Sequence, residues 1–220
     1  MQNELTKHEH YVISHPNDVK KIFILESPDS EELRRNYPCA KNTGIKMSKE
    51  LLSSNSPESN KALGELIYQE FPSVIPYAVF NTFKFPLNIN IDFDAPLTPE
   101  KEMWRHLKSY DTVSWNECKS LERTERRTRH FGNLSKLINI LNKVDSSVLS
   151  DYKESLHNTI NLYPLLEEIT ICGFIAQSVF MNVFNQEDPG YKRRKPITIT
   201  DRNVLLYFVN HPSRVKKWNY

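Results

Sequence analysis

The sequence predicts an α/β fold, a three-layer α/β/α sandwich around a central, mostly parallel sheet of about four strands. Four short runs of β-branched and aromatic residues alternate with stretches of helical character, a pattern typical of a buried parallel sheet. The runs are residues 21–25, 77–80, 169–172 and 204–209. Polar or tight-turn residues follow each run, and ligands of such sheets bind beyond the carboxyl ends of the strands. We therefore expect a functional site at that edge.

The segments around these runs predict the remaining elements. We expect residues 1–19 to form an N-terminal arm or helix and residues 20–220 to form one domain, a natural size for a single core. Apolar residues spaced by three and four predict the helices. These helices are expected at 30–35, 45–52, 62–70, 134–141, 152–166 and 176–184. Thr98 before Pro99 is typical of a helix start, and the Pro- and Asn-rich residues 85–99 predict a loop over the site edge.

Composition and cysteine content are typical of a cytoplasmic protein. No apolar stretch approaches the roughly 20 residues that cross a bilayer, and the first residues lack the apolar run of a signal peptide. The three cysteines, Cys39, Cys118 and Cys172, are widely spaced and odd in number, as expected for free thiols in a reducing compartment. No Cys/His pattern has the spacing of a zinc site. We expect a monomer with no metal, cofactor or membrane association.

Basic residues are unevenly distributed despite the net charge of +2. Residues 191–220 hold eight Lys or Arg and a single acid, Asp201. A second basic run lies at 119–129. Such segments usually supply the phosphate contacts of nucleic-acid-binding proteins, so we expect one face to bind a polyanion. A solvated helix or hairpin would explain the 119–129 run equally well, whereas the terminal run flanks a His-Pro-Ser motif on both sides.

The residues after the four runs resemble motifs of the uracil-DNA glycosylase superfamily, most closely its short members with a G-E-x-P-G first motif. The matching stretches are L-E-S-P-D at 25–29, Y-P-C-A-K-N-T-G at 37–44, F-N-T-F-K-F-P at 80–86, G-F-I-A at 173–176 and H-P-S at 211–213. The family patterns beside the last four are R-P-F-V-G-x-x-G, T-N-x-x-K-x-x-P, G-x-x-A and H-P-S. The order is that of the family, and each stretch but the second lies at or just after the end of a run.

This resemblance implies a DNA glycosylase, which flips a damaged or modified base out of DNA and hydrolyses its N-glycosidic bond, leaving an abasic site. It implies that His211 donates a hydrogen bond to the departing base. Glu26, aided by Ser27, would position or activate the attacking water, or stabilise the charged sugar. Asp29 is a second carboxylate candidate, although it could instead cap the helix expected at 30–35. A structural alternative for His211 is to cap the end of its strand.

Base recognition is expected from the first two motifs. The residues expected to bind the substrate are Pro28, Asp29, Tyr37, Cys39, Asn81 and Lys84. The amide of Asn81 offers a donor and an acceptor for the base edge. An Asn at the end of a strand can instead hydrogen-bond its own backbone and form a turn. Cys39 stands where relatives stack an aromatic ring on the base, so Tyr37 takes over the stacking or the pocket is wider. Lys84 could also contact a phosphate.

A wider pocket suits a base larger than uracil, such as a deaminated purine or a bulky modified pyrimidine. Glucosylated cytosines of phage DNA would be one such substrate, and the protein would then serve antiviral defence rather than DNA repair.

The C-terminal residues are the expected contacts to the DNA backbone and base stack. They are Ser213, Arg214, Val215, Lys216 and Lys217. Ser213 and its neighbouring amides would hold a phosphate, and Arg214 or Val215 would enter the space that the flipped base leaves. Trp218 would stack on a base or pack on its own domain.

Departures from the family pattern keep other function classes open. Ser27 stands where many members have an Asp or Asn that orients water, so a catalytically silent nucleic-acid-binding relative is one alternative. Another is a hydrolase of nucleotides or small molecules that shares only the layout. The chain has five glycines, no Gly-rich phosphate loop and no G-x-S-x-G elbow, which disfavours this second alternative. Some G-E-x-P-G relatives carry a four-cysteine iron–sulfur cluster, and with three cysteines at other spacings we expect none here.

Overall fold

A mixed sheet forms the centre of the protein in the computed structural model. The structure describes residues 11–12, 18–26, 32, 35, 37–52, 56–68, 75–83, 98–190 and 193–212. Within these residues the sheet has six strands in the order β1-β3-β2-β4-β6-β5. They are β1 (Tyr11–Val12), β2 (Lys21–Leu25), β3 (Tyr77–Asn81), β4 (Glu168–Cys172), β5 (Arg194–Ile199) and β6 (Arg202–Val209). The four central strands are parallel, which confirms the α/β fold, and β1 and β5 add antiparallel edges.

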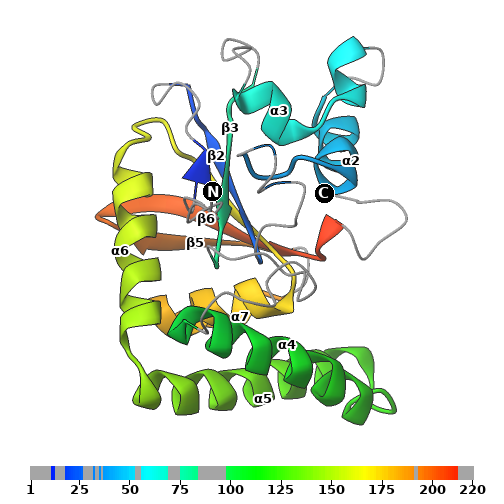
Figure 1. Ribbon diagram of the computed structural model, residues 1–220, viewed down its shortest axis with the longest axis vertical. Helices are drawn as coiled ribbons and strands as arrows, with labels where there is room; N and C mark the ends of the chain where they lie inside the picture. The colour runs from blue at the N-terminus through cyan, green and yellow to red at the C-terminus, as the bar shows by residue number, and fades with distance from the viewer. Residues whose placement is uncertain are drawn as a thin grey trace, which may run out of the picture.

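Helices cover the two faces of the sheet (Figure 1). Among the described residues they are α2 (Asn42–Leu51), the 3-10 helix η1 (Pro57–Asn60), α3 (Leu63–Tyr68), α4 (Pro99–Glu117), α5 (Arg123–Val144), α6 (Ser147–Asn161) and α7 (Phe174–Phe184). The expected start of α4 is confirmed, since Thr98 Oγ1 accepts a hydrogen bond of 3.3 Å from the amide of Lys101. In Figure 1, α2 and α3 lie at the top of the view, and α4, α5 and α7 lie together at its bottom.

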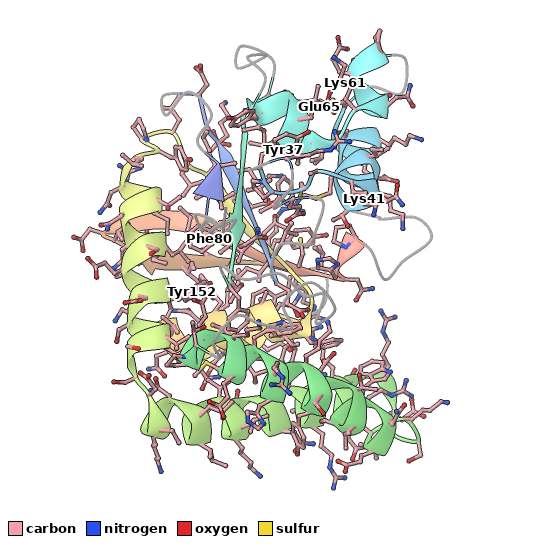
Figure 2. The ribbon with its side chains drawn as sticks, viewed as in Figure 1. Tyr37, Lys41, Lys61, Glu65, Phe80 and Tyr152 are labelled. Atoms are coloured by element: carbon pink, nitrogen blue, oxygen red, sulfur yellow. The ribbon has the colours of Figure 1, made fainter. Side chains whose placement is uncertain are left out.

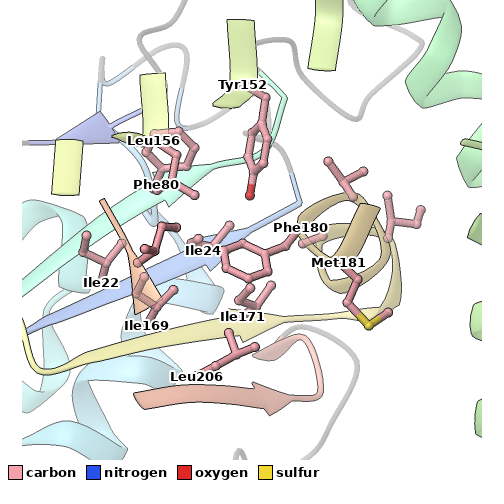
Figure 3. Close-up of a cluster of buried hydrophobic side chains, with 14 of the residues drawn as sticks. Ile22, Ile24, Phe80, Tyr152, Leu156, Ile169, Ile171, Phe180, Met181 and Leu206 are labelled. Carbon is pink, nitrogen blue, oxygen red and sulfur yellow. The ribbon is translucent and has the colours of Figure 1, made fainter. Parts of the chain in front are cut away.

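Alternate strand residues supply two separate cores. Ile22, Ile24 and Phe80 pack with residues of α6 and α7 on one face (Figure 3). Phe23 and Leu25 pack with residues of α2 and α3 on the other face. A parallel strand that is buried on both faces is apolar at nearly every position, which explains why these strands were recognisable as continuous runs.

The two edge strands were not expected. Tyr11 and Val12, within the segment expected to be an arm or helix, pair with Phe80 and Val79 of β3. β5 alternates between exposed and buried residues, and its first two positions are Arg194 and Lys195 of the basic C-terminal region. An alternating strand of this kind is half solvated and lacks the apolar run that marks a central strand.

Two glycines allow the segment before α2 to pack against α2 and α3. A Cβ on Gly44 would lie 1.8 Å from the carbonyl oxygen of Cys39, and one on Gly64 would lie 1.6 Å from that of Pro38. Both obstacles are backbone atoms, which cannot rotate away. We expect Gly44→Ala to lower the free energy of unfolding by about 1–3 kcal/mol in urea denaturation, because it overpacks this contact.

The matched control is Gly132→Ala in the middle of α5, where no atom lies within 4 Å of the added Cβ. Alanine is favoured over glycine inside a helix, so this variant should gain about 0.5–1 kcal/mol. Equal stability of the two variants would contradict the close packing of Gly44.

Candidate functional site

The carboxyl ends of the four parallel strands bring the sequence-predicted residues to one edge. Asn81 is the last residue of β3 and pairs with Leu25, the residue before Glu26. β4 lies between β2 and β6. Gly173 follows β4, and a Cβ on it would lie 3.2 Å from the Cβ of His211, which follows β6. The residues after β3, β2, β4 and β6 therefore form a row along this edge, as the sequence predicted.

Glu26 is buried and held by two donors from α4. Its side-chain oxygen Oε1 accepts hydrogen bonds from Trp104 Nε1 at 3.2 Å and from Lys108 Nζ at 2.8 Å. The residue is 3% exposed, whereas the Lys108 side chain is 35% exposed. A buried carboxylate is tolerated when a cation and a further donor compensate for lost hydration. Both donors were missed in the sequence.

One face of α4 extends along the edge from the end of β2 to the end of β6. Its side chains there recur at spacings of four, three and four: Trp104, Lys108, Asp111 and Trp115. Such residues lie on one side of an α-helix. The first two contact Glu26, and the last two line a cavity that His211 also lines. The spacing was visible in the sequence, but it did not show that this face meets the site.

We call this space the His211 cavity. It has a volume of about 610 Å³ and lies between α4, the first turns of α5 and α7, and Asn210 and His211. Its walls include the aromatic rings of Trp115 and Phe174. Its basic side chains are Arg123, Arg126 and Arg127. The volume is within the range of sites for small ligands, about 300–1,000 Å³.

The arginines at the cavity belong to the basic run at 119–129. Arg127 makes two hydrogen bonds of 2.8 Å to Asp188, and Arg126 donates to the carbonyl oxygens of Lys119 and Leu121 at 2.7 and 2.8 Å. The guanidinium of Arg126 also lies 5.5 Å from the ring centre of Trp115. These contacts hold two of the cationic groups in place at the wall, so the run is more than a freely solvated helix face.

His211 and Asn81 differ in their access to this cavity. His211 is 9% exposed and lines it, and Asn81 is fully buried and is not among the described lining residues. The turn after β3 is held by Thr82, whose amide and Oγ1 both donate to the carbonyl oxygen of Leu25, at 2.9 and 2.8 Å. Asn81 thus sits in a rigid turn at the end of its strand.

Tyr37 lies in the layer of α2 and α3 (Figure 2), and Cys39 belongs to the same core cluster. The Tyr37 ring stacks on Tyr68 with a centroid distance of 5.4 Å, and the residue is 4% exposed. Cys39 is fully buried with its Sγ 3.5 Å from Met47 Sδ, and its amide donates to Glu32 Oε1 at 2.7 Å. Neither is among the described residues of the His211 cavity. Both side chains are therefore part of the core of this layer.

Burial raises the pKa of the Cys172 thiol, at the end of β4. A thiol in apolar surroundings stays protonated and is a poor nucleophile. Cys172 therefore serves the core rather than the chemistry of this edge.

Several sequence-predicted residues lie outside the described part of the chain. They are Ser27, Pro28, Asp29, Lys84, Ser213, Arg214, Val215, Lys216, Lys217 and Trp218, together with most of the expected helix at 30–35 and loop at 85–99. Their roles stay predictions. Pro212 is described, and its carbonyl oxygen accepts a hydrogen bond of 3.4 Å from Lys46 of α2.

Among the described residues, no group of three or more His, Cys, Asp or Glu side chains is placed to hold a metal ion. No helix in the same part of the chain has the length and apolar character needed to cross a membrane. No protein-family model matches the chain, and no curated protein matches it.

Proposed function

We propose that the protein is a DNA glycosylase, a divergent member of the uracil-DNA glycosylase superfamily, which hydrolyses the N-glycosidic bond of a flipped base. The observation that carries the proposal is the position of His211, which follows the last parallel strand and lines a cavity of about 610 Å³. Glu26 follows β2 and Asn81 ends the neighbouring strand β3, at the same edge of the sheet. A cytoplasmic monomer acting on DNA is part of the same proposal.

The chemistry needs a donor for the base and a negative charge for the sugar. As the C1′–N bond breaks, negative charge collects on the base and positive charge on the deoxyribose. His211 would donate a hydrogen bond to the base at this stage. Two donors of α4 hold the Glu26 carboxylate through Oε1, and we assign this carboxylate to the attacking water or to the charged sugar.

The His211 cavity supports a substrate base larger than uracil. Trp115 and Phe174 provide apolar surface, and the three arginines provide positive charge at the wall for a polar substituent or for DNA phosphates. A bulky modified pyrimidine, such as a glucosylated cytosine of phage DNA, would use more of this space. Excision of such a base would leave abasic sites in phage DNA, and the protein would then be an antiviral enzyme.

A panel of DNA duplexes and single strands with altered bases tests the proposal. The panel holds uracil, hypoxanthine, 5-hydroxymethylcytosine and glucosylated 5-hydroxymethylcytosine, each incubated with the protein and analysed for free base. We expect release of at least one base with an abasic site left behind. Tight DNA binding without release of any base would indicate a silent binder, and cleavage of free nucleotides alone would indicate a small-molecule hydrolase.

Asn81→Asp should change which base is accepted. The substitution replaces an amide donor by a carboxylate oxygen, so a base that accepts a hydrogen bond there loses its partner. We expect the ratio of kcat/KM between two bases of the panel to change roughly 5- to 150-fold, which corresponds to about 1–3 kcal/mol of discrimination.

Thr82→Val is the control for Asn81, because it removes a hydrogen bond of the same turn. It should lower the melting temperature and leave the ratio between bases unchanged. If Asn81→Asp, like Thr82→Val, lowers only the melting temperature and leaves the ratio between bases unchanged, Asn81 stabilises the turn after β3 and does not recognise the base.

A further inference from the structure

The His211 cavity contains a carboxylate that the sequence motifs do not include. Asp111 of α4 lines the cavity and is 3% exposed. Its Oδ1 lies 3.0 Å from Nε2 of His130 on α5, which is fully buried. The ring of His130 meets Phe174 edge-on at 4.8 Å and Trp115 at 5.5 Å, both residues of the cavity wall. Asp111 is thus held at the wall by a ring that cannot turn freely.

A chain of hydrogen bonds behind His130 determines the direction in which its protons point. Asn133 Nδ2 donates to Ser114 Oγ at 3.0 Å, and Ser114 Oγ lies 3.0 Å from His130 Nδ1. Since an amide nitrogen only donates, the serine oxygen accepts from Asn133 and can direct its own proton to Nδ1. Nε2 of the ring then donates to Asp111 Oδ1. We assign this tautomer from the hydrogen bonds.

Packing alone does not account for this arrangement. A buried polar network gains little stability over apolar residues of similar volume, because its members lose their hydration. Elsewhere α4 and α5 bury apolar residues such as Leu107 and Leu134, which belong to the same core cluster. The polar network occurs where the two helices meet the cavity, and it ends on a residue of the cavity wall.

We propose that Asp111 is a catalytic residue that takes the proton of the attacking water, and that His130 is the positioning residue that orients it. This inference rests on the proposed glycosylase function. The C1′–N bond breaks with its electron pair going to the base, which His211 stabilises. The water oxygen forms the new bond to C1′, its proton passes to Asp111, and the base then takes up a proton from solvent. Glu26, paired with Lys108, stabilises the charged sugar.

The test compares single-turnover base release by variants on the panel DNA that the wild-type protein cleaves. Asp111→Asn keeps the shape and an oxygen that can accept from His130, but it cannot take a proton. We expect the rate to fall about 100-fold or more, within the range for general base catalysis, with the Kd for DNA within about twofold of the wild type. Glu117→Gln on the same helix makes the same chemical change at an exposed residue and should retain the wild-type rate.

Two further variants separate catalysis from structure. Asp111→Ala leaves space for a small carboxylate, so added sodium formate should restore its rate at least about tenfold, because an external base can replace the missing one. His130→Gln retains a donor near the Nε2 position and should stay closer to the wild type than His130→Leu. Melting temperatures are measured beside every rate.

Each outcome decides the proposal. A wild-type rate for Asp111→Asn would overturn the role of Asp111 and leave the glycosylase function standing. A slow Asp111→Asn variant with a lowered melting temperature, together with no effect of formate on Asp111→Ala, would show a structural role and would also overturn it. If the wild-type protein releases no base from any DNA of the panel, both the glycosylase function and this role of Asp111 are contradicted.

Discussion

His211→Ala is expected to slow base release about 10²- to 10³-fold under single-turnover conditions, roughly the loss for one donor that acts in the transition state. The donor is needed mainly as the base gains negative charge, so the Kd for DNA should change little. The position supports this expectation, because His211 follows β6, lines the cavity and lies against Gly173. The rate and the Kd are measured on the same DNA.

The control for His211 is His106→Ala. His106 is exposed on α4, with its Nε2 3.8 Å from Glu102, and should be dispensable for cleavage. His211→Gln retains a donor and should recover part of the lost rate. A normal rate for His211→Ala, combined with a lower melting temperature, would mean that His211 only caps the end of its strand.

Glu26→Gln is expected to slow base release about 100-fold, because the oxocarbenium-like sugar loses the negative charge that offsets its own. The substitution also leaves the Lys108 ammonium without its carboxylate partner, now 2.8 Å from Glu26 Oε1. A lower melting temperature should therefore accompany the slower rate.

A double-mutant cycle with Lys108→Met separates these two effects. Removing both charges should restore much of the stability that Glu26→Gln loses, because no cation is then left without a partner, but it should not restore the rate. The exposed pair of Lys20 and Glu167 provides the control, with 3.5 Å between its charged atoms. Glu167→Gln should change neither quantity, as for most exposed pairs. Recovery of the rate in the double variant would contradict a catalytic role of Glu26.

The central strands could be predicted from the sequence almost to the residue, and the edge strands could not. The run expected at 21–25 is β2, and the run expected at 77–80 is β3 without its last residue, Asn81. These strands are covered on both faces, so nearly every position is apolar. β5 has one solvated face and contains Pro196, and it pairs with β6 on one side only. From the sequence alone, these residues are indistinguishable from a basic loop, and only their pairing with β6 identifies them as a strand.

The candidate site could be predicted where it follows the strands, and not where it comes from helices. Glu26 and Asn81 directly follow apolar runs, and His211 is the second residue after one. Lys108 and Asp111 are polar residues of an amphipathic helix, and the sequence does not distinguish such residues from the solvated face of that helix. Only the position of α4 against the sheet edge buries Asp111 and brings Lys108 to Glu26.

His130, the residue after the basic run at 119–129, is another example of a helical residue whose burial the sequence did not predict. The preceding positions 122–129 are all charged or polar, yet the ring is fully buried, because α5 turns His130 towards Asp111 of α4. The depth of a residue in a helix pair depends on the crossing of the two helices, which local spacing does not contain.

The most direct measurement of the proposed function counts free base and abasic sites together in one single-turnover reaction. The wild-type protein and His211→Ala are incubated with DNA that carries one altered base, and both products are quantified by mass spectrometry. Hydrolysis of the N-glycosidic bond predicts equal amounts of the two products from the wild type, and much slower formation of both by His211→Ala. Bound DNA with neither product, or release of the base still attached to its sugar, would contradict glycosylase action at this site.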